Sequence, residues 1–291
     1  MEAAETRIIR EYVAAGGDLY CHHTRTPAMG HSYHNASKAH RQYELLLLLE
    51  GEISYVIEGK AYQVRPGDMI FVAPGEIHAL EIDGRYSYER MVLLFDTRAL
   101  HRMAEELQVT LPGFAEGARQ HLHIIKRELV TAFGLDRILR EIVCCEEEPY
   151  RCVLAEARLI ELAVQLDRLI HAHGEALALP DVRDPLIAGV VEYIDGHVGE
   201  PLPLSRLAER FYVSVSTLSH RFSAVMHISP AQYVTLKKMH CAAELLREGH
   251  SATRVAEMVG YDSYVSFFYN YSKLMKESPA VTAKGETARI R

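Results

Sequence analysis

Residues 204–222, "LSRLAERFYVSVSTLSHRF", and residues 252–271, "ATRVAEMVGYDSYVSFFYNY", are two copies of one pattern. Leu207-Ala208-Glu209 of the first copy aligns with Val255-Ala256-Glu257 of the second. Each copy predicts a short helix, a polar N-cap residue and a second helix. The first helix carries a small alanine at the position where the second helix must approach closely. The residues suited to the cap are Ser214 in the first copy and Asp262 or Ser263 in the second. The repeat predicts two helix-turn-helix units.

The segment between the copies predicts one long connecting helix. Residues 229–249, "SPAQYVTLKKMHCAAELLREG", begin with Ser229 as a good N-cap and Pro230 at the position where proline suits a helix start. Gly249 suits the helix end, because glycine adopts the left-handed conformation at low cost. We therefore expect an all-α domain in the C-terminal part of the chain.

The first hundred residues predict strands. Residues 42–82, "QYELLLLLEGEISYVIEGKAYQVRPGDMIFVAPGEIHALEI", contain strand-length apolar runs separated by turn residues. The run Leu45–Leu49 suits a buried strand, and residues 53–64 suit a hairpin with its turn at Glu58-Gly59-Lys60. Short, evenly spaced strands indicate a small antiparallel barrel or sandwich.

Helical spacing begins near residue 98. Leucines at three- and four-residue intervals (Leu159, Leu162, Leu166 and Leu169) predict one amphipathic helix, and residues 121–143 predict another. We expect these helices to pair two copies of the chain. Two prolines mark residues 174–185 as a linker. The expected organisation is α+β: a β-rich domain at 1–173, the linker, and an all-α domain at 186–291.

Bulk composition narrows the class of protein. The chain has 291 residues, 48% of them hydrophobic and 24% charged, as in globular proteins of two domains. No segment approaches the ~20 apolar residues of a membrane helix. The start "MEAAETRIIR" has no apolar signal core, so we expect a cytoplasmic protein. The five cysteines lack the regular spacing of a disulfide framework, which indicates free thiols. These thiols could be buried and inert, or they could form a redox or metal sensor.

Charge is unevenly divided along the chain. The net charge is −7, yet residues 182–291 carry 13 Lys and Arg against 11 Asp and Glu. The preceding residues carry 19 against 28. Phosphate would repel the acidic first part more than the second, so the division permits nucleic-acid binding in the C-terminal domain alone.

Taken together, the two units and their connecting helix resemble the AraC/XylS family of transcription regulators over residues 186–280. The resemblance implies a sequence-specific DNA-binding regulator, with a homodimer expected and RNA polymerase as a candidate partner. Members commonly have a glycine in the loop after each recognition helix, where this chain has His227 and Lys276.

The N-terminal half resembles the cupin-like sensing domain of the same family. "HRQYELLLLLEG" (40–51) and "RPGDMIFVAPGEIH" (65–78) correspond to its two motifs. The resemblance implies an antiparallel barrel with His40, Glu44 and His78 in a pocket for a small effector, a carbohydrate or related metabolite. Metal-binding cupins usually have further histidines where this chain has Lys38 and Ile82. We therefore expect an effector pocket without a metal, the alternatives being a metal site or residues that only tie strands together.

Helical geometry assigns faces to both recognition helices. In the first, Val215, Leu218, Phe222 and Val225 are expected to face inward. In the second, Tyr264, Phe267, Tyr271 and Leu274 are expected to do so. The expected DNA contacts are Arg206, Ser216, Thr217, His220, Arg221 and Lys237 for the first unit and Ser266, Tyr269, Asn270 and Lys273 for the second. Because the second face carries little charge, we expect it to contribute less, or to serve packing only.

Two other classes of function remain open at this stage. One is a metal-dependent cupin enzyme, an isomerase or dioxygenase, with a helical appendage. The other is a regulator that acts through protein partners and binds DNA weakly. The missing metal-ligand positions weigh against the enzyme, and the double helix-turn-helix has no role in it.

Overall fold

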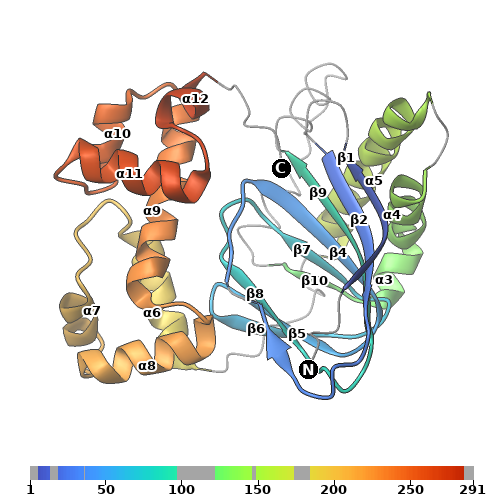
Figure 1. Ribbon diagram of the computed structural model, residues 1–291, viewed down its shortest axis with the longest axis horizontal. Helices are drawn as coiled ribbons and strands as arrows, with labels where there is room; N and C mark the ends of the chain where they lie inside the picture. The colour runs from blue at the N-terminus through green and yellow to red at the C-terminus, as the bar shows by residue number, and fades with distance from the viewer. Residues whose placement is uncertain are drawn as a thin grey trace.

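The computed structural model describes residues 6–13, 19–35, 37–96, 122–145, 149–173 and 184–284. It has a β-rich part and a helical part, which lie side by side (Figure 1). The strands are β1 (Arg7–Val13), β2 (Leu19–Thr26), β3 (Tyr33–His34), β4 (Gln42–Glu50), β5 (Ile53–Ile57), β6 (Lys60–Val64), β7 (Met69–Val72), β8 (His78–Ile82), β9 (Tyr88–Asp96) and β10 (Ile124–Ile125). The helices are α3 (Arg127–Ala132), α4 (Leu135–Val143), α5 (Arg151–His173), α6 (Pro185–Gly196), α7 (Leu204–Arg210), α8 (Val215–Met226), α9 (Pro230–Arg247), α10 (Ala252–Met258), α11 (Tyr264–Met275) and α12 (Pro279–Ala283).

Two antiparallel sheets form the N-terminal domain. The larger has the order β1-β2-β9-β4-β7-β10, and the smaller has the order β3-β8-β5-β6. Leu46 and Leu48 of β4 pack between the sheets, whereas Leu45 and Leu47 pack on the opposite face. Because both faces of β4 are covered, its apolar run is continuous rather than alternating. The predicted buried strand is confirmed.

Helices α3, α4 and α5 cover the outer face of the larger sheet, away from the C-terminal domain (Figure 1). The prediction of a single helix at 121–143 is wrong in part: β10 occupies 124–125, and Gly134 separates α3 from α4. The leucine stripe of α5 is buried in the core of its own domain, at Leu159, Leu162, Leu166 and Leu169. These leucines are therefore core residues and not a surface that pairs two chains.

The hairpin β5–β6 is confirmed, and its turn holds an unusual residue. Glu58 and Gly59 both have positive φ, 48° and 75°, as a two-residue type I′ hairpin turn requires. Asn, Asp or Gly usually stands at the first position, because other side chains are strained there. Glu58 tolerates this conformation because its carboxylate accepts hydrogen bonds from the backbone of Ile77 and from the C-terminal domain.

The C-terminal domain has the predicted order of helices. Helices α7 and α8 form the first unit, α10 and α11 form the second, and α9 runs between them (Figure 1). The caps follow the sequence: Ser214 accepts from Thr217, Ser263 from Ser266, and Ser229 forms a capping box before Pro230. Of the expected linker, residues 174–183 lie outside the described part, and Asp184 with Pro185 begins α6.

Each unit has its own apolar core. The second is enclosed by α9, α10 and α11 around Phe267 and Tyr271. The first includes Leu218 and Phe222, and it also takes in Val56, Ala61 and Ile77 of the barrel domain. The first helix-turn-helix unit is thus packed against the N-terminal domain through a shared core.

Candidate DNA-binding surface and effector pocket

The first recognition helix, α8, presents a polar face to solvent. Ser216, Thr217 and His220 are exposed, as predicted, while Leu218 and Phe222 are buried. Hydroxyl and imidazole groups can donate to or accept from base edges and phosphates.

The inward assignment of Val215 is wrong. Its side chain is 44% exposed, because the first turn of α8 projects past the core. Val225 is half-buried rather than buried. The turn before the helix also holds an exposed residue that the sequence argument missed, since Tyr212 is 93% exposed with φ 54°.

The arginines near α8 are engaged by acids of the same domain. Arg221 donates two hydrogen bonds to Asp184, at 2.9 and 2.6 Å, and the same carboxylate caps α6. Arg206 donates to Glu200 at 2.7 Å and to the carbonyl of Pro201. The pairing with Asp184 holds the pKa of Arg221 above its ordinary value. Both arginines are partly exposed but would have to exchange these partners to contact phosphate.

The second recognition helix, α11, presents aromatic and polar side chains. Val265, Ser266, Tyr269 and Lys273 are exposed, and Asn270 donates to the hydroxyl of Tyr261 at 3.2 Å. Lys273 lies over the ring of Tyr269, with the ammonium 6.0 Å from its centroid.

The core side of α11 is narrower than expected. Phe267 and Tyr271 are fully buried, as predicted. Tyr264 is 42% exposed because it stands in the first turn, so its inward assignment is wrong. Leu274 is half-buried, and Phe268 is 42% exposed beside Tyr264. The exposed face of α11 is thus more aromatic than the sequence argument predicted.

A buried ion cluster joins the two domains. The ammonium of Lys237 in α9 lies 2.9 Å from Glu58 and 3.0 Å from Asp195, and Tyr233 also donates to Glu58. Burial by itself lowers the pKa of Lys237, but the two carboxylates outweigh that effect and raise it above its ordinary value. Burial and the charge of Glu58 raise the pKa of Asp195 to about 6. The expectation that Lys237 contacts DNA is corrected: its side chain is 16% exposed and is held by two acids.

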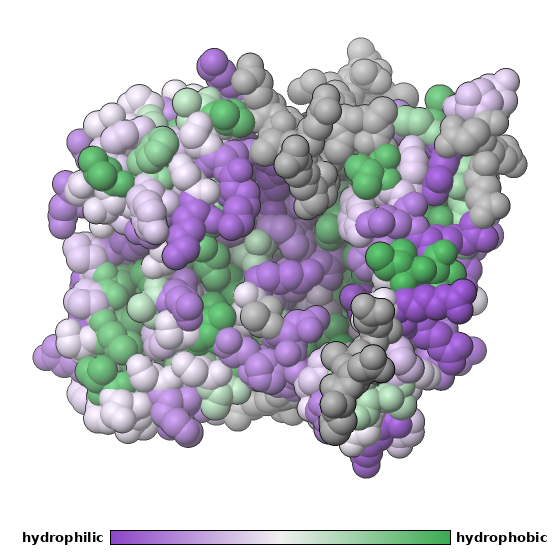
Figure 2. Space-filling model, in the orientation of Figure 1, coloured by the Kyte–Doolittle hydropathy of each residue, from purple (hydrophilic) through white to green (hydrophobic). Residues whose placement is uncertain are grey.

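Further contacts cross the domain boundary. His227, which follows α8, lies 2.9 Å from Glu81 of β8 and stacks on His34 with centroids 4.1 Å apart. Arg41 lies 3.3 Å from Glu277 beside α12. Hydrophilic residues gather in the middle of the face drawn in Figure 2, where the two domains meet. The arrangement of the domains is therefore fixed by charged contacts as well as by the shared core.

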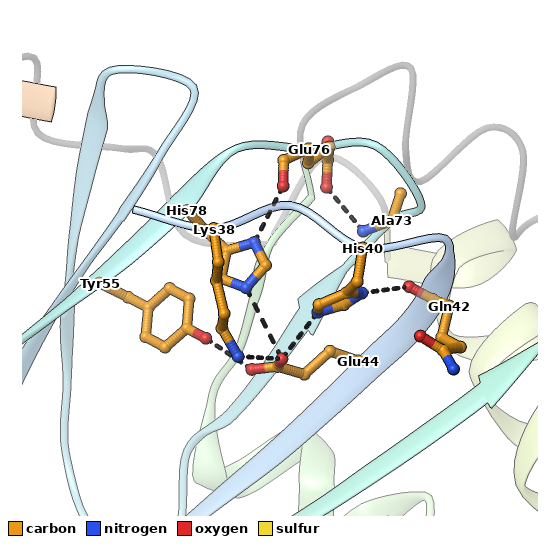
Figure 3. Close-up of polar contacts among 8 residues, drawn as sticks. All are labelled: Lys38, His40, Gln42, Glu44, Tyr55, Ala73, Glu76 and His78. Carbon is orange, nitrogen blue, oxygen red and sulfur yellow. Dashed lines mark hydrogen bonds and ion pairs between the residues drawn. The ribbon is translucent and has the colours of Figure 1, made fainter. Parts of the chain in front are cut away.

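The three predicted effector residues meet inside the barrel domain (Figure 3). His40 Nε2 lies 3.0 Å from Glu44 Oε2, and His78 Nε2 lies 3.6 Å from the same oxygen. The Lys38 ammonium is 3.2 Å from that oxygen, and the Tyr55 hydroxyl donates to Oε1 at 2.5 Å. Although burial alone would raise it, Lys38 and the two histidines hold the pKa of Glu44 well below its ordinary range.

Backbone carbonyls fix the orientation of both imidazoles. His40 Nδ1 lies 2.9 Å from the carbonyl of Gln42, and His78 Nδ1 lies 2.9 Å from that of Glu76. A carbonyl only accepts, so each Nδ1 carries the proton and each Nε2 faces Glu44.

The same residues could hold a divalent metal ion. Their donor atoms lie within 4.8 Å of one another, and two imidazoles with a carboxylate are common ligands. The Lys38 ammonium competes for the carboxylate oxygen that would bind the ion. The expectation of an effector pocket without a metal stays a prediction.

One segment connects this pocket with the domain interface. Residues 73–78 carry Ile77, which bonds Glu58 and lies in the shared core, and then His78, which faces Glu44. Glu76 accepts from the backbone of Ala73 at 2.6 Å, and its burial raises its pKa to about 8. A ligand that moves His78 would therefore also move a segment on which the interface rests.

Comparison with known proteins decides the family. A family model described as an AraC-like ligand binding domain matches residues 16–172, and one described as a helix-turn-helix domain matches residues 207–285. The chain belongs to the AraC family. It is a DNA-binding transcription regulator with an N-terminal ligand-binding domain, and the predicted family and α+β fold class are confirmed.

Several AraC-family relatives match most of this chain. It is 27% identical over 249 residues to the MmsAB operon regulatory protein of Pseudomonas aeruginosa, covering 83% of this chain and 75% of the relative. It is 23% identical over 260 residues to the XylDLEGF operon transcriptional activator 1 of Pseudomonas putida, covering 83% and 74%. Among solved structures, the C-terminal domain of AraT, a response regulator from Geobacillus stearothermophilus, is 30% identical with a TM-score of 0.35, covering 36% of this chain and 88% of that one.

Among the described residues of this AraC-family chain, no helix has both the length and the apolar character needed to cross a membrane.

In the loops after the two recognition helices, this chain has His227 and Lys276 where members of the AraC family commonly have glycine. His227 and Lys276 both end their helices in the left-handed conformation, with φ 55° and 59°. We expect Lys276→Gly to raise the free energy of unfolding by roughly 0.5–1 kcal/mol, because glycine adopts this conformation without the Cβ clash. Chemical denaturation would measure it. His227→Gly is the matched control and should give no gain, since it also removes the contacts with Glu81 and His34. A Lys276→Gly variant of lower stability would contradict this account.

Proposed function

We propose that this regulator binds a small metabolite, a carbohydrate or related compound, in the pocket of His40, Glu44 and His78. The metabolite would change how the helix-turn-helix domain is held, and would not fold it. One observation carries this proposal: residues 73–78 belong both to the pocket and to the interface with the first unit. A ligand acts by favouring one of two arrangements, so it must contact a part that both arrangements share.

We propose that α8 and α11 enter successive major grooves on one face of DNA. The contacts would come from Ser216, Thr217 and His220 in the first unit and from Ser266, Tyr269, Asn270 and Lys273 in the second. Arg206 and Arg221 would contribute only after leaving their acidic partners. Because the exposed face of α11 is mostly aromatic and uncharged, its contribution would be the smaller one.

We propose that the chain acts as a homodimeric, cytoplasmic activator without catalytic activity, and that RNA polymerase is a partner. Relatives named as operon regulators and activators support this role. Because the leucine stripe of α5 is buried, a second copy would have to use the opposite face of that helix. Val153 and Val164 are 68% and 38% exposed there. Sedimentation of the purified chain, with Val153→Asp as the disrupting variant, tests the dimer.

The DNA surface is tested by binding of the full chain to the DNA upstream of its own gene. The affinity should fall steeply with salt, since each phosphate contact releases counterions. We expect Thr217→Ala with His220→Ala to weaken binding by about 1–3 kcal/mol for each base that is no longer bound, and Tyr269→Ala to weaken it less. His31→Ala, an exposed histidine of the barrel domain, is the matched control and should bind as the wild type does. Binding without salt dependence, or equal reductions in affinity from changes in both units, would contradict the proposal.

A further inference from the structure

The effector pocket contains more charge than the three predicted residues account for. It is a small cavity of about 70 Å³ inside the barrel. Arg90 of β9, His22 of β2 and Lys38 line it together with Glu44, Tyr55 and His78. Val92, two positions after Arg90 in β9, packs between the sheets. Residues two apart in a strand face the same side, so the side chain of Arg90 is directed into the barrel.

Arg90 is a cation in need of an anion. Its guanidinium lies over the ring of Tyr88, 4.8 Å from the centroid. Among the described residues, no carboxylate lies within ion-pair distance of it, whereas Arg25, Arg41 and Arg85 of the same domain each have one. A charge turned into an apolar-walled site is costly unless a counter-charge accompanies it.

Glu44 does not provide that counter-charge. Its two oxygens already face Tyr55, His40 and Lys38. Against this one carboxylate stand the ammonium of Lys38 and the guanidinium of Arg90. The pocket therefore carries an excess of positive charge that a ligand with a negative charge would balance.

The pocket also offers buried acceptors. His78 is 1% exposed, and its Nδ1–H is donated to a carbonyl. Its Nε2 is 3.6 Å from Glu44 Oε2 and has no hydrogen-bond partner among the described residues. His22 Nδ1 is also buried and has no hydrogen-bond partner in the part of the chain that the structure describes. Burial and the charge of Arg90 lower the pKa of His22 to about 4. Neutral imidazole nitrogens of this kind accept from a hydroxyl. Unpaired buried polar atoms are uncommon in folded proteins and mark places where a ligand can bind.

We infer that the effector is a small hydroxy acid, whose carboxylate pairs with Arg90 and Lys38 and whose hydroxyl donates to His78. This inference rests on the proposed function of the pocket and narrows its ligand from carbohydrates and related metabolites to acids. A neutral sugar would leave Arg90 without an anion. A divalent cation bound by His40, Glu44 and His78 would add positive charge where an excess already exists.

The test compares each acid with its amide, which has nearly the same shape and no charge. Glycolate, lactate and glycerate, and then glycolamide, lactamide and glyceramide, are titrated calorimetrically into the chelator-treated full chain. We expect at least one acid to bind, and its amide to bind roughly 30-fold more weakly or worse. Arg90→Gln should weaken the acid by a similar factor. Arg25→Gln, which changes an arginine outside the pocket that pairs with Glu50, should have no effect.

The acid–amide comparison on wild-type protein stands even if Arg90→Gln fails to fold. The inference is overturned if an amide or glycerol binds as well as the acids, if none of the acids binds at millimolar concentration, or if binding requires an added metal. The DNA titration separates this result from the proposed function. Salt-dependent DNA binding with no response to any acid would refute the hydroxy acid and leave the regulator standing.

Discussion

Lys237→Met is expected to lower the free energy of unfolding by about 3 kcal/mol, the cost of removing one partner from a buried ion pair. The ammonium bridges Glu58 of the barrel and Asp195 of α6, and its loss leaves two carboxylates facing each other with Glu58 only 4% exposed. Asp195 retains some solvent, at 35%, so we take the lower end of the usual range. Equilibrium denaturation followed by circular dichroism would measure the change.

Two controls give the result its meaning. Lys284→Met changes an exposed lysine after α12 and should alter stability by less than ~0.5 kcal/mol. Adding Glu58→Gln to Lys237→Met removes one of the isolated charges and should recover part of the loss, because neighbouring changes couple. If Lys237→Met lowered the free energy of unfolding by less than ~1 kcal/mol, the ion pair would contribute no more than a surface salt bridge does. That result would contradict the buried interface.

Phe267→Ala is expected to cost about 3–5 kcal/mol, as does truncation of other fully buried aromatic side chains. Phe267 is 0% exposed and packs with Val255, Val259 and Tyr271 in a core that the first unit does not share. The second unit should therefore melt by itself, while the first keeps its packing on the barrel. Hydrogen exchange would locate the loss in α10 and α11.

The neighbouring Tyr269→Ala separates packing from DNA binding. Tyr269 is 64% exposed, so its truncation should change stability by less than ~0.5 kcal/mol. DNA affinity should fall in both variants, but only Phe267→Ala should also lose protected amides. If Tyr269→Ala destabilised the domain as much as Phe267→Ala, the assignment of the two faces of α11 would be wrong.

Local rules made much of the chain readable in sequence. Ser214, Ser229 and Gly249 predict helix ends because a cap depends on a few adjacent residues. The repeat of Leu207-Ala208-Glu209 at residues 255–257 predicts two units because each must enclose a similar small core. The same rules failed in the first turns of α8 and α11, where Val215 and Tyr264 extend beyond the core that periodicity assumes.

The candidate site was predicted in part. Motif spacing brought His40, Glu44 and His78 together, as the structure does. Arg90 and His22 were missed because they come from β9 and β2, and only pairing of these strands in the sheet brings them to the pocket. The signal was an arginine among the apolar residues of β9, which a covered strand does not normally carry.

Caps, periodicity and motifs involve residues close together in the chain, so the elements, the two helix-turn-helix units and the family resemblance were predictable from the sequence. The role of each charged side chain followed only from the packing of distant segments. In the sequence, Lys237 was predicted to contact phosphate, but in the structure it pairs with Glu58, which lies in a hairpin 179 residues away. The leucines of α5 read as a dimer surface until the sheet covers them. Burial and ion pairing depend on residues distant in the chain, and no local pattern reports them.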